Sequence, residues 1–170
     1  FFTATVQVAR NNGSGGFPFD QVSTVAIGGS GGNLAVADFD GDGDRDLISA
    51  NIGGPTISIR RNNGSGVFAD AGSANVVVGS GAISFSGMRA GDLDADGDLD
   101  LIGTEANTDR AYRLLNTGGL TFAANGDYAV GDQPEGLALA DLDGDGALDL
   151  VTANFGFGTS TLTVRTSPPP

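Results

Sequence analysis

The chain contains no cysteine, histidine, lysine or tryptophan among its 170 residues. Without cysteine it has neither a disulfide framework nor a thiolate metal site. Without histidine and lysine it lacks the commonest general base, the main nitrogen ligand of zinc and the amine nucleophile. Its only basic residues are eight scattered arginines, so we expect no nucleic-acid partner. A membrane-spanning helix needs roughly 20 consecutive apolar residues, and no run in the sequence approaches that length. The sequence therefore predicts no membrane span.

Glycine and acidic residues, by contrast, are abundant. The sequence has 29 glycines, a hydrophobic fraction of 39% and a net charge of −13. Many Gly, Asn and Ser residues among short apolar runs favour strands joined by tight turns over general disorder. Fourteen of the 21 acidic residues lie in only three segments, so the acidity is mostly local.

The three acidic segments are copies of one motif. They read DFDGDGDRDL from Asp38, DLDADGDLDL from Asp92 and DLDGDGALDL from Asp141, at intervals of about fifty residues. A motif that returns with this period indicates a repeated supersecondary unit. We therefore expect residues 1–170 to form a single array of repeats, with approximate units 1–30, 31–80, 81–131 and 132–170.

Between the acidic segments, apolar and polar residues alternate over short runs, which is typical of strands. In each unit the pattern predicts a strand that enters the acidic loop, a second that leaves it, a third after a polar turn and a fourth after an Asn-Gly type turn. The predicted ranges are 34–38, 86–92 and 136–141 for the first strand, 46–51, 100–106 and 149–154 for the second, 56–61, 110–115 and 161–166 for the third, and 74–79 for one fourth strand.

Four antiparallel strands form one blade of a β-propeller. The chain begins on a strand of the third type and ends after another, which gives thirteen strands. The predicted fold class is therefore all-β, with propeller-type blades, about three of them together with incomplete terminal units. The acidic loops lie between the first and second strands of a blade.

Carboxylates at alternate positions, with glycine allowing a sharp turn, place hard oxygen ligands around one cation, as calcium requires. Without a cation the carboxylates would repel one another. An EF-hand needs a glutamate at the twelfth loop position, where this chain has Ser49, Gly103 and Thr152, and it needs flanking helices. The sequence therefore predicts three Ca²⁺ sites of another kind.

An aspartate at the ninth loop position, followed by leucine and a strand, recurs in DFDGDGDRDLISAN, DLDADGDLDLIGTE and DLDGDGALDLVTAN. In these motifs the chain resembles the FG-GAP/VCBS repeat family, whose calcium-loop blades also build integrin α-subunit propellers and many bacterial surface proteins. The resemblance covers nearly the whole chain. It implies side-chain ligands at the first, third, fifth and ninth loop positions and a backbone carbonyl ligand at the seventh.

Residue by residue, the implied ligands are Asp38, Asp40, Asp42 and Asp46 with the carbonyl of Asp44; Asp92, Asp94, Asp96 and Asp100 with the carbonyl of Asp98; and Asp141, Asp143, Asp145 and Asp149 with the carbonyl of Ala147. Alanine at the seventh position of the third loop agrees with a role for the carbonyl alone.

Apolar residues at the second and tenth loop positions are expected to pack between blades; they are Phe39, Leu93, Leu142, Leu47, Leu101 and Leu150. The glycine-rich segments at 10–15 and 60–66 have neither the lysine nor the following helix of a phosphate-binding loop, and they are interpreted as hairpin turns.

Catalysis finds little support in the sequence. Glu105 and Glu135 are the only glutamates, and although a correctly spaced carboxylate pair can hydrolyse glycosides, no nucleophile and base accompany them. We therefore expect no enzyme.

Incomplete terminal blades expose a strand edge or an apolar flank that invites another chain. The leading hypothesis is a secreted, calcium-binding structural or adhesive protein that self-assembles into a ring, filament or tube. The alternative is an extracellular propeller module, cut from a larger surface protein, that binds carbohydrate or protein. An accessory domain of a polysaccharide-degrading enzyme ranks third. Because such calcium sites stay empty in cytosol, the expected location is extracellular or on the cell surface, in a bacterium or archaeon.

Overall fold

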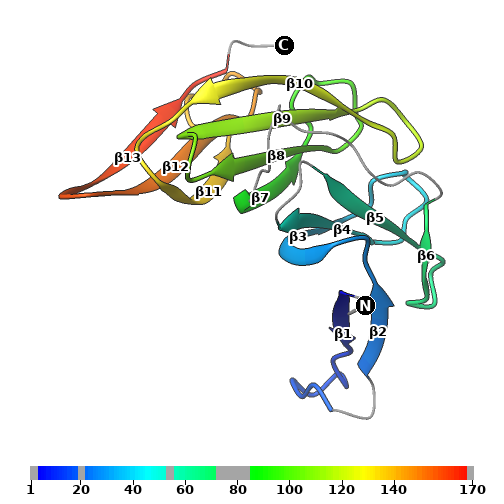
Figure 1. Ribbon diagram of the computed structural model, residues 1–170. Coiled ribbons are helices and arrows are strands. Elements are labelled where there is room, and N and C mark those ends of the chain that lie inside the picture. The colour runs from blue at the N-terminus through cyan, green and yellow to red at the C-terminus, as the bar shows by residue number, and fades with distance from the viewer. Residues whose placement is uncertain (1–3, 19–21, 53–55, 72–84, 168–170) are drawn as a thin grey trace.

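The structure is a computed structural model that describes residues 4–18, 22–52, 56–71 and 85–167 (Figure 1). The regular elements of this part are thirteen β-strands, and it contains no helix. Their bounds are β1 Thr5–Ala9, β2 Val22–Ala26, β3 Ser30–Ala37, β4 Asp46–Ile52, β5 Ile57–Asn62, β6 Phe68–Asp70, β7 Phe85–Gly91, β8 Asp100–Glu105, β9 Arg110–Asn116, β10 Phe122–Ala129, β11 Pro134–Ala140, β12 Asp149–Gly156 and β13 Thr159–Arg165. The all-β prediction is confirmed.

The strands form four antiparallel sheets in chain order: β1–β2, β3–β6, β7–β10 and β11–β13. Within each sheet every strand pairs with its neighbour in sequence, as in a propeller blade. In Figure 1 the sheets follow one another along an arc, and the described strands do not close into a ring. Two complete blades between a two-stranded and a three-stranded sheet confirm the prediction of propeller-type blades with incomplete terminal units.

The acidic loops lie where the sequence predicts them, between β3 and β4, β7 and β8, and β11 and β12. One predicted strand cannot be compared with the structure. The fourth strand of the first complete blade is β6 at Phe68–Asp70, directly after the glycine-rich turn, whereas the predicted strand at 74–79 falls outside the described residues. The proposed unit boundaries remain a prediction.

The first strand of each acidic-loop sheet has a shift of register near its start. The shift lies between Gly31 and Leu34 in β3, between Phe85 and Gly87 in β7, and between Pro134 and Gly136 in β11. A β-bulge increases the local twist of a strand. Strands β3, β7 and β11 lie side by side on the inner side of the arc, so the twist recurs at the same place in each sheet.

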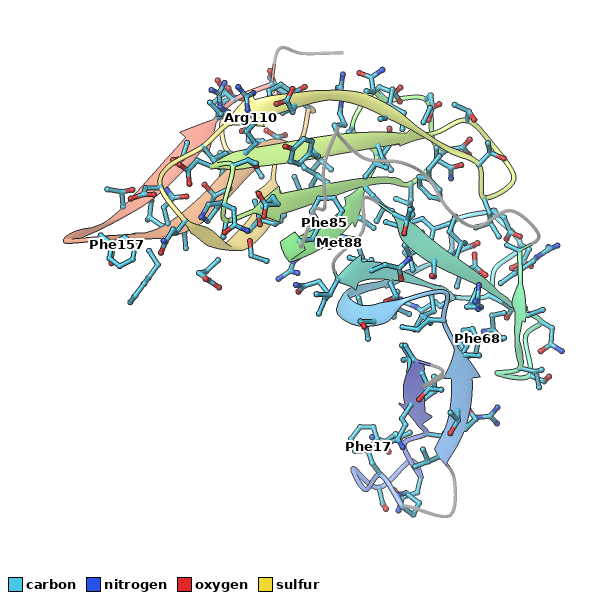
Figure 2. The ribbon with its side chains drawn as sticks, in the orientation of Figure 1. Phe17, Phe68, Phe85, Met88, Arg110 and Phe157 are labelled. Carbon is cyan, nitrogen blue, oxygen red and sulfur yellow. The ribbon has the colours of Figure 1, made fainter. Side chains whose placement is uncertain are left out.

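The hydrophobic core lies between the sheets. A first cluster joins sheet β3–β6 to sheet β7–β10, and Figure 2 labels two of its members, Phe85 and Met88. A second cluster joins sheet β7–β10 to sheet β11–β13; its buried members are Ile102, Ala111, Leu137 and Leu150. The cores are therefore contacts between blades.

Most of the apolar loop residues pack between blades as expected. Phe39, Leu47, Leu101 and Leu150 are buried, and Leu93 packs against the second cluster. The expectation is wrong for Leu142, whose relative exposure is 53%. The reason is that, among the described residues, no sheet packs against the face of β11–β13 to which Leu142 belongs.

Candidate metal centre

Each acidic loop is shaped by its first aspartate. The Asp38 carboxylate accepts hydrogen bonds from the backbone N–H groups of Gly41 (2.8 Å) and Gly43 (2.9 Å). Asp141 accepts the same two bonds at 2.7 and 3.0 Å from the glycines of its own loop. These bonds wrap the loop around one carboxylate. In both loops the donors lie three and five residues after the aspartate, so the bonds are local in sequence.

Glycine at the sixth loop position allows the wrap. Its φ is 92° at Gly43, 96° at Gly97 and 91° at Gly146, in the left-handed region that favours glycine. At the fourth position the second loop has Ala95 with a φ of 62°, where the other two loops have glycine. The second loop therefore carries backbone strain that the others lack.

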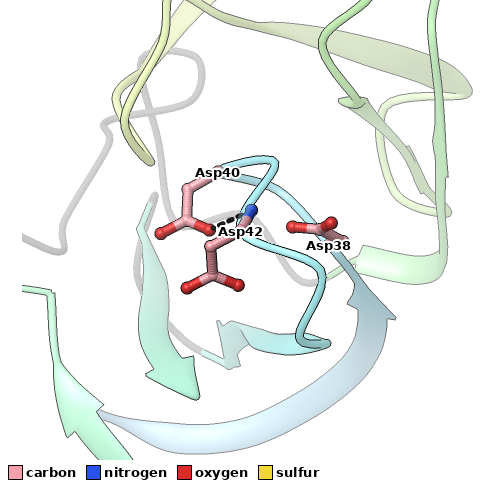
Figure 3. A group of neighbouring side chains, drawn as sticks. All are labelled: Asp38, Asp40 and Asp42. Carbon is pink, nitrogen blue, oxygen red and sulfur yellow. Dashed lines mark hydrogen bonds between the residues drawn. The ribbon is translucent and has the colours of Figure 1, made fainter. Parts of the chain in front are cut away.

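The loops bring carboxylates together. In the first loop, one carboxylate oxygen from each of Asp38, Asp40 and Asp42 lies within 4.8 Å of the other two. Figure 3 shows these three side chains in the loop between β3 and β4. The matching groups are Asp92, Asp94 and Asp96 in the second loop and Asp141, Asp143 and Asp149 in the third. Of the predicted ligands, these groups do not include Asp46, Asp100 or Asp145. Such groups of carboxylates could each hold a metal ion.

One oxygen atom stands out within these groups. Asp92 Oδ1 is buried and has no hydrogen-bond partner among the described residues. In the other two loops the matching Oδ1 atom accepts the N–H of the fourth-position glycine, Gly41 or Gly144. A buried carboxylate oxygen without a partner is costly, and a cation bound in the loop would satisfy it. The residues present therefore fit a metal ion.

The ninth-position aspartates have a structural role that the sequence reasoning missed. Asp100 is fully buried; its Oδ2 accepts the N–H of Leu93 (2.8 Å) and its Oδ1 accepts the N–H of Asn116 (2.8 Å). Asp46 and Asp149 make the equivalent pair of bonds. Each aspartate thus ties the start of its loop to the end of the third strand. The sequence did contain a signal for this role, because in all three loops the ninth-position aspartate directly precedes a leucine at the start of a strand.

Burial changes the acidity of these clamping residues. It raises the pKa of Asp46 and of Asp100, while hydrogen bonds from backbone N–H groups oppose the rise. In the first loop the N–H of Asp44, followed by the guanidinium of Arg61, lowers the pKa of Asp42. The loop carboxylates therefore experience different local fields.

Among the described residues, only the first loop has carboxylates that form ion pairs with an arginine. Arg61 forms ion pairs with Asp40 (2.7 Å) and Asp42 (2.9 Å). It directly precedes Asn62, which donates to the clamping Asp46. The residues at the same place in the other two sheets are Leu115 and Thr166, which carry no charge. The first loop thus has a cationic side chain of its own on two of its three clustered carboxylates.

At the seventh loop position the backbone matters more than the side chain. The N–H groups of Asp44, Asp98 and Ala147 each donate to Oδ1 of the fifth-position aspartate at 2.9 Å. This bond turns the backbone in the same way in all three loops. It forms equally well with alanine, so an acidic side chain is dispensable there.

Glu105 does not resemble a catalytic acid. It is 1% exposed, and its carboxylate accepts hydrogen bonds from the Asn107 side chain and the Thr108 N–H. Burial opposes ionisation, but these hydrogen bonds prevail and lower the pKa of Glu105. Glu105 thus caps the turn after β8, while Glu135 is exposed.

A cleft of about 620 Å³ opens between sheets β7–β10 and β11–β13. Ile102, Leu139 and Leu150 contribute apolar lining. The guanidinium carbons of Arg113 and Arg165 each lie 5.9 Å from the centre of the Tyr128 ring, which also lines the cleft. The cleft combines an aromatic surface with two cations.

The sheet order and the repeated acidic loops define a protein built from propeller-type blades with a candidate metal site in each loop. A family model described as FG-GAP-like repeat matches the chain three times, at residues 3–49, 38–103 and 92–152. The chain belongs to the FG-GAP-like repeat family. A comparison with curated proteins finds no match.

FG-GAP repeats are typical of extracellular or surface proteins and suggest an adhesion-type module; as a family they are non-enzymatic repeat domains that mediate protein interactions. Repeats of this family often bind Ca²⁺. In the part of the chain that the structure describes, no helix is long and apolar enough to cross a membrane.

Proposed function

We propose that the chain is a calcium-stabilised structural or adhesive module in which each acidic loop holds one Ca²⁺ and which self-assembles through its terminal sheets. The observation that carries the calcium assignment is the buried Oδ1 of Asp92, which has no hydrogen-bond partner in the described part of the chain and belongs to a group of three carboxylates. A hard divalent cation satisfies this atom and offsets the repulsion among its neighbours.

Calcium suits these loops because they offer only hard oxygen ligands. The family resemblance implies four aspartates and one backbone carbonyl as ligands in each loop. The structure also allows the ninth-position aspartate to be one of them. Although both oxygens of Asp100 already accept an N–H, a carboxylate oxygen has a second lone pair available. The clamping aspartates could therefore hold the loop and ligate the ion together.

Calcium would contribute stability that grows with the logarithm of its concentration once this exceeds Kd. At tenfold excess over Kd, one site adds about 1.4 kcal/mol to the free energy of unfolding. Extracellular modules commonly bind calcium with Kd near 10⁻⁴ to 10⁻³ M, in the range that exists outside cells. An extracellular location, in keeping with the family, allows the sites to be filled.

Calorimetry on chelator-treated protein tests the calcium assignment. We expect uptake of three Ca²⁺ per chain and a rise in the melting temperature on adding calcium. Magnesium at the same concentration is the control, because it demands a smaller, octahedral set of ligands. Absence of calcium uptake at millimolar concentration would overturn the assignment.

Light scattering and electron microscopy, with calcium and then with chelator, test self-assembly. Rings or filaments that dissociate in chelator are the expected result, since the ion of the third loop holds the terminal sheet β11–β13 in shape. A chain that stays monomeric in both conditions would contradict self-assembly and leave the calcium assignment standing on its own test.

The cleft beside Tyr128 favours a second candidate, a module that binds an acidic carbohydrate. A sugar ring can stack on the aromatic face while Arg113 or Arg165 pairs with its carboxylate. A glycan array probed with the chain and with Tyr128→Ala would test it. Binding that Tyr128→Ala abolishes would support this candidate, and no glycan binding by the unaltered chain would remove it.

A further inference from the structure

The outer face of sheet β11–β13 has apolar residues at the same positions as a face that is buried elsewhere in the chain. We define the forward face of a sheet as the face toward the next sheet along the chain, and the rear face as the opposite one. The forward face of sheet β3–β6 belongs to the first core cluster, packed against sheet β7–β10. Its core residues are Ala35, Phe39, Ile48, Ala50, Ile57 and Ile59.

Strand register identifies the counterpart of each of these residues in sheet β11–β13. Ile48 and Val151 are both the second residue after the clamping aspartate, and each pairs across the sheet with an alanine and an aliphatic residue. Phe39 and Leu142 both occupy the second loop position. The six counterparts are Ala138, Leu142, Val151, Ala153, Leu162 and Val164, and every one is apolar.

The two equivalent faces differ in exposure. Ile57 and Ile59 are 0% and 1% exposed, whereas their counterparts Leu162 and Val164 are 71% and 55% exposed. Phe39 is 2% exposed and Leu142 is 53% exposed. Apolar residues gathered on one open face mark an interaction surface. The forward face of β11–β13 therefore has the apolar residues of a contact between blades, but no described sheet covers them.

The other end of the arc presents the matching half. In β10, Phe122 follows a turn closed by the bond from Thr117 N–H to the Thr121 carbonyl, and it packs edge-on against Phe39 at 5.7 Å. Phe17 follows the equivalent turn, closed by the bond from Asn12 N–H to the Gly16 carbonyl.

Phe122 is 5% exposed, but Phe17 is 60% exposed. Figure 2 shows Phe17 beside β1 and β2 at one end of the arc, far from Phe157 at the β13 end. Phe17 thus lies on a rear face at the place where Phe122 fills a contact between blades.

We propose that a second copy of this chain docks the rear face of its β1–β2 sheet onto the forward face of β11–β13, so that Phe17 of one copy packs against Leu142 of the other. The inference rests on the self-assembly proposed above and names the surfaces that carry it. The contact repeats the Phe122–Phe39 arrangement within the chain and continues the arc from one copy to the next.

Charge also favours this pair of faces. Each chain has a net charge of −13, so two copies repel one another over most of their surfaces. The six forward-face residues carry no charge, and the exposed rear-face residues of β1 are Thr5, Gln7 and Ala9, which carry none either. The contact is heterologous, so repetition produces a ring if the rotation closes and a filament if it does not.

Disulfide trapping tests the contact directly, because the chain has no cysteine of its own. Phe17→Cys and Leu142→Cys are prepared as separate proteins, mixed in calcium and oxidised. We expect a disulfide-linked heterodimer. The matched control replaces Phe17→Cys with Val67→Cys, which is also 60% exposed and whose carbonyl closes the equivalent turn of the next sheet. The control pair is expected to yield no linked dimer above background.

A charge placed on the forward face provides the second test. Leu162→Asp is expected to abolish the assembled species in light scattering while three Ca²⁺ still bind per chain. Ile52→Asp, at a site 50% exposed and outside the docking faces, is the control that should leave assembly intact. Both sites are exposed in the free chain, so neither variant is expected to unfold it.

The outcomes separate the two proposals. Particles that form without the linked 17–142 pair, or that survive Leu162→Asp, would show that self-assembly uses other surfaces and would overturn the docking inference alone. A chain that binds calcium but remains monomeric would overturn both self-assembly and docking, as expected if a further blade of a longer polypeptide covers the face.

Discussion

At the scale of single residues, the aspartates of one acidic loop have two different roles, which are to present oxygens to an ion and to hold the backbone of the sheet. The first-position residue Asp92 turns the loop and presents a buried oxygen that lacks a hydrogen-bond partner among the residues that the structure describes. In the ninth-position residue Asp100, both carboxylate oxygens accept hydrogen bonds from backbone N–H groups, one from the loop and one from the end of the third strand. Substitutions can therefore separate ion binding from the mechanical role of the loop.

Asp92→Asn tests the ion-binding role. A charge-assisted contact contributes about 1.5–3 kcal/mol, so its loss should weaken calcium binding at the second loop roughly tenfold to a hundredfold. Calorimetry should then show two unaltered sites and one weak site. The control is Asp98→Asn, at the seventh position, where Ala147 shows that the side chain is dispensable. Three unchanged sites in Asp92→Asn would argue against this ligand.

Arg61→Gln tests competition between a side chain and the ion. Arg61 pairs with Asp40 and Asp42 and would have to move or share them when calcium binds. We therefore expect the first loop to bind calcium most weakly, and Arg61→Gln to strengthen that site, as measured by calorimetry at low salt. Arg89→Gln, in a sheet whose loop has no such ion pair, is the control. An unchanged or weaker first site would contradict the competition.

At the scale of elements, the second strand of each blade carries a buried polar residue, five positions after the clamping aspartate, that bonds to the turn or strand that follows. Asn51 donates to the Thr56 hydroxyl (2.8 Å), and Asn154 donates to Thr163 (3.0 Å). Glu105 stands at the same place and holds its turn by accepting bonds. The glutamate that the sequence offered as a weak catalytic candidate is thus a variant of a repeated structural device.

Glu105→Gln tests this device through its pH dependence. The folded-state pKa of Glu105 lies below the usual 4.5, so its charge stabilises the fold above that pH, and the contribution is lost as pH falls through the depressed value. At neutral pH the variant should lose about 1–3 kcal/mol, because its amide cannot accept both hydrogen bonds.

Urea unfolding of the two proteins at neutral pH and in acid measures this difference. The two free energies of unfolding should converge in acid, where protonated Glu105 resembles glutamine. Glu135→Gln, at an exposed position, serves as the control and should change little. A gap between Glu105→Gln and the unaltered chain that is constant with pH would rule out the charge as its source.

At the scale of the whole molecule, stability depends on how each blade covers the next. Phe39 and Leu142 occupy the same loop position, yet the first is 2% exposed and the second 53% exposed. Phe39→Ala should cost about 3–5 kcal/mol, since it leaves a cavity beside Phe122. Leu142→Ala should change the free energy of unfolding of the free chain by less than about 0.5 kcal/mol.

Urea unfolding in chelator, at low protein concentration, measures both variants without assembly. Similar costs for Phe39→Ala and Leu142→Ala would mean that Leu142 is already buried in the free chain, in conflict with the structure. If Leu142→Ala becomes costly only when calcium and high protein concentration permit assembly, the extra cost measures the contact between copies.

Local pattern was enough to predict the strands and the loops. Alternation with a period of two, and glycine-rich turns at fixed offsets, depend on neighbouring residues, so the acidic loops fall between first and second strands as the sequence indicates. In the first complete blade the described fourth strand is the short Phe68–Asp70, while the predicted strand at 74–79 lies outside the described residues and stays a prediction.

The sequence by itself therefore determined the repeat, the all-β blades and the groups of aspartates, because each is encoded within a few adjacent residues. Only the tertiary structure decided that Asp100 accepts a hydrogen bond from Asn116, and that Asp92 Oδ1 has no hydrogen-bond partner within the described ranges. It also decided that Leu142 is exposed where Phe39 is buried. These outcomes depend on groups that are distant in sequence, and burial is a property of what packs against a residue, which local spacing does not contain.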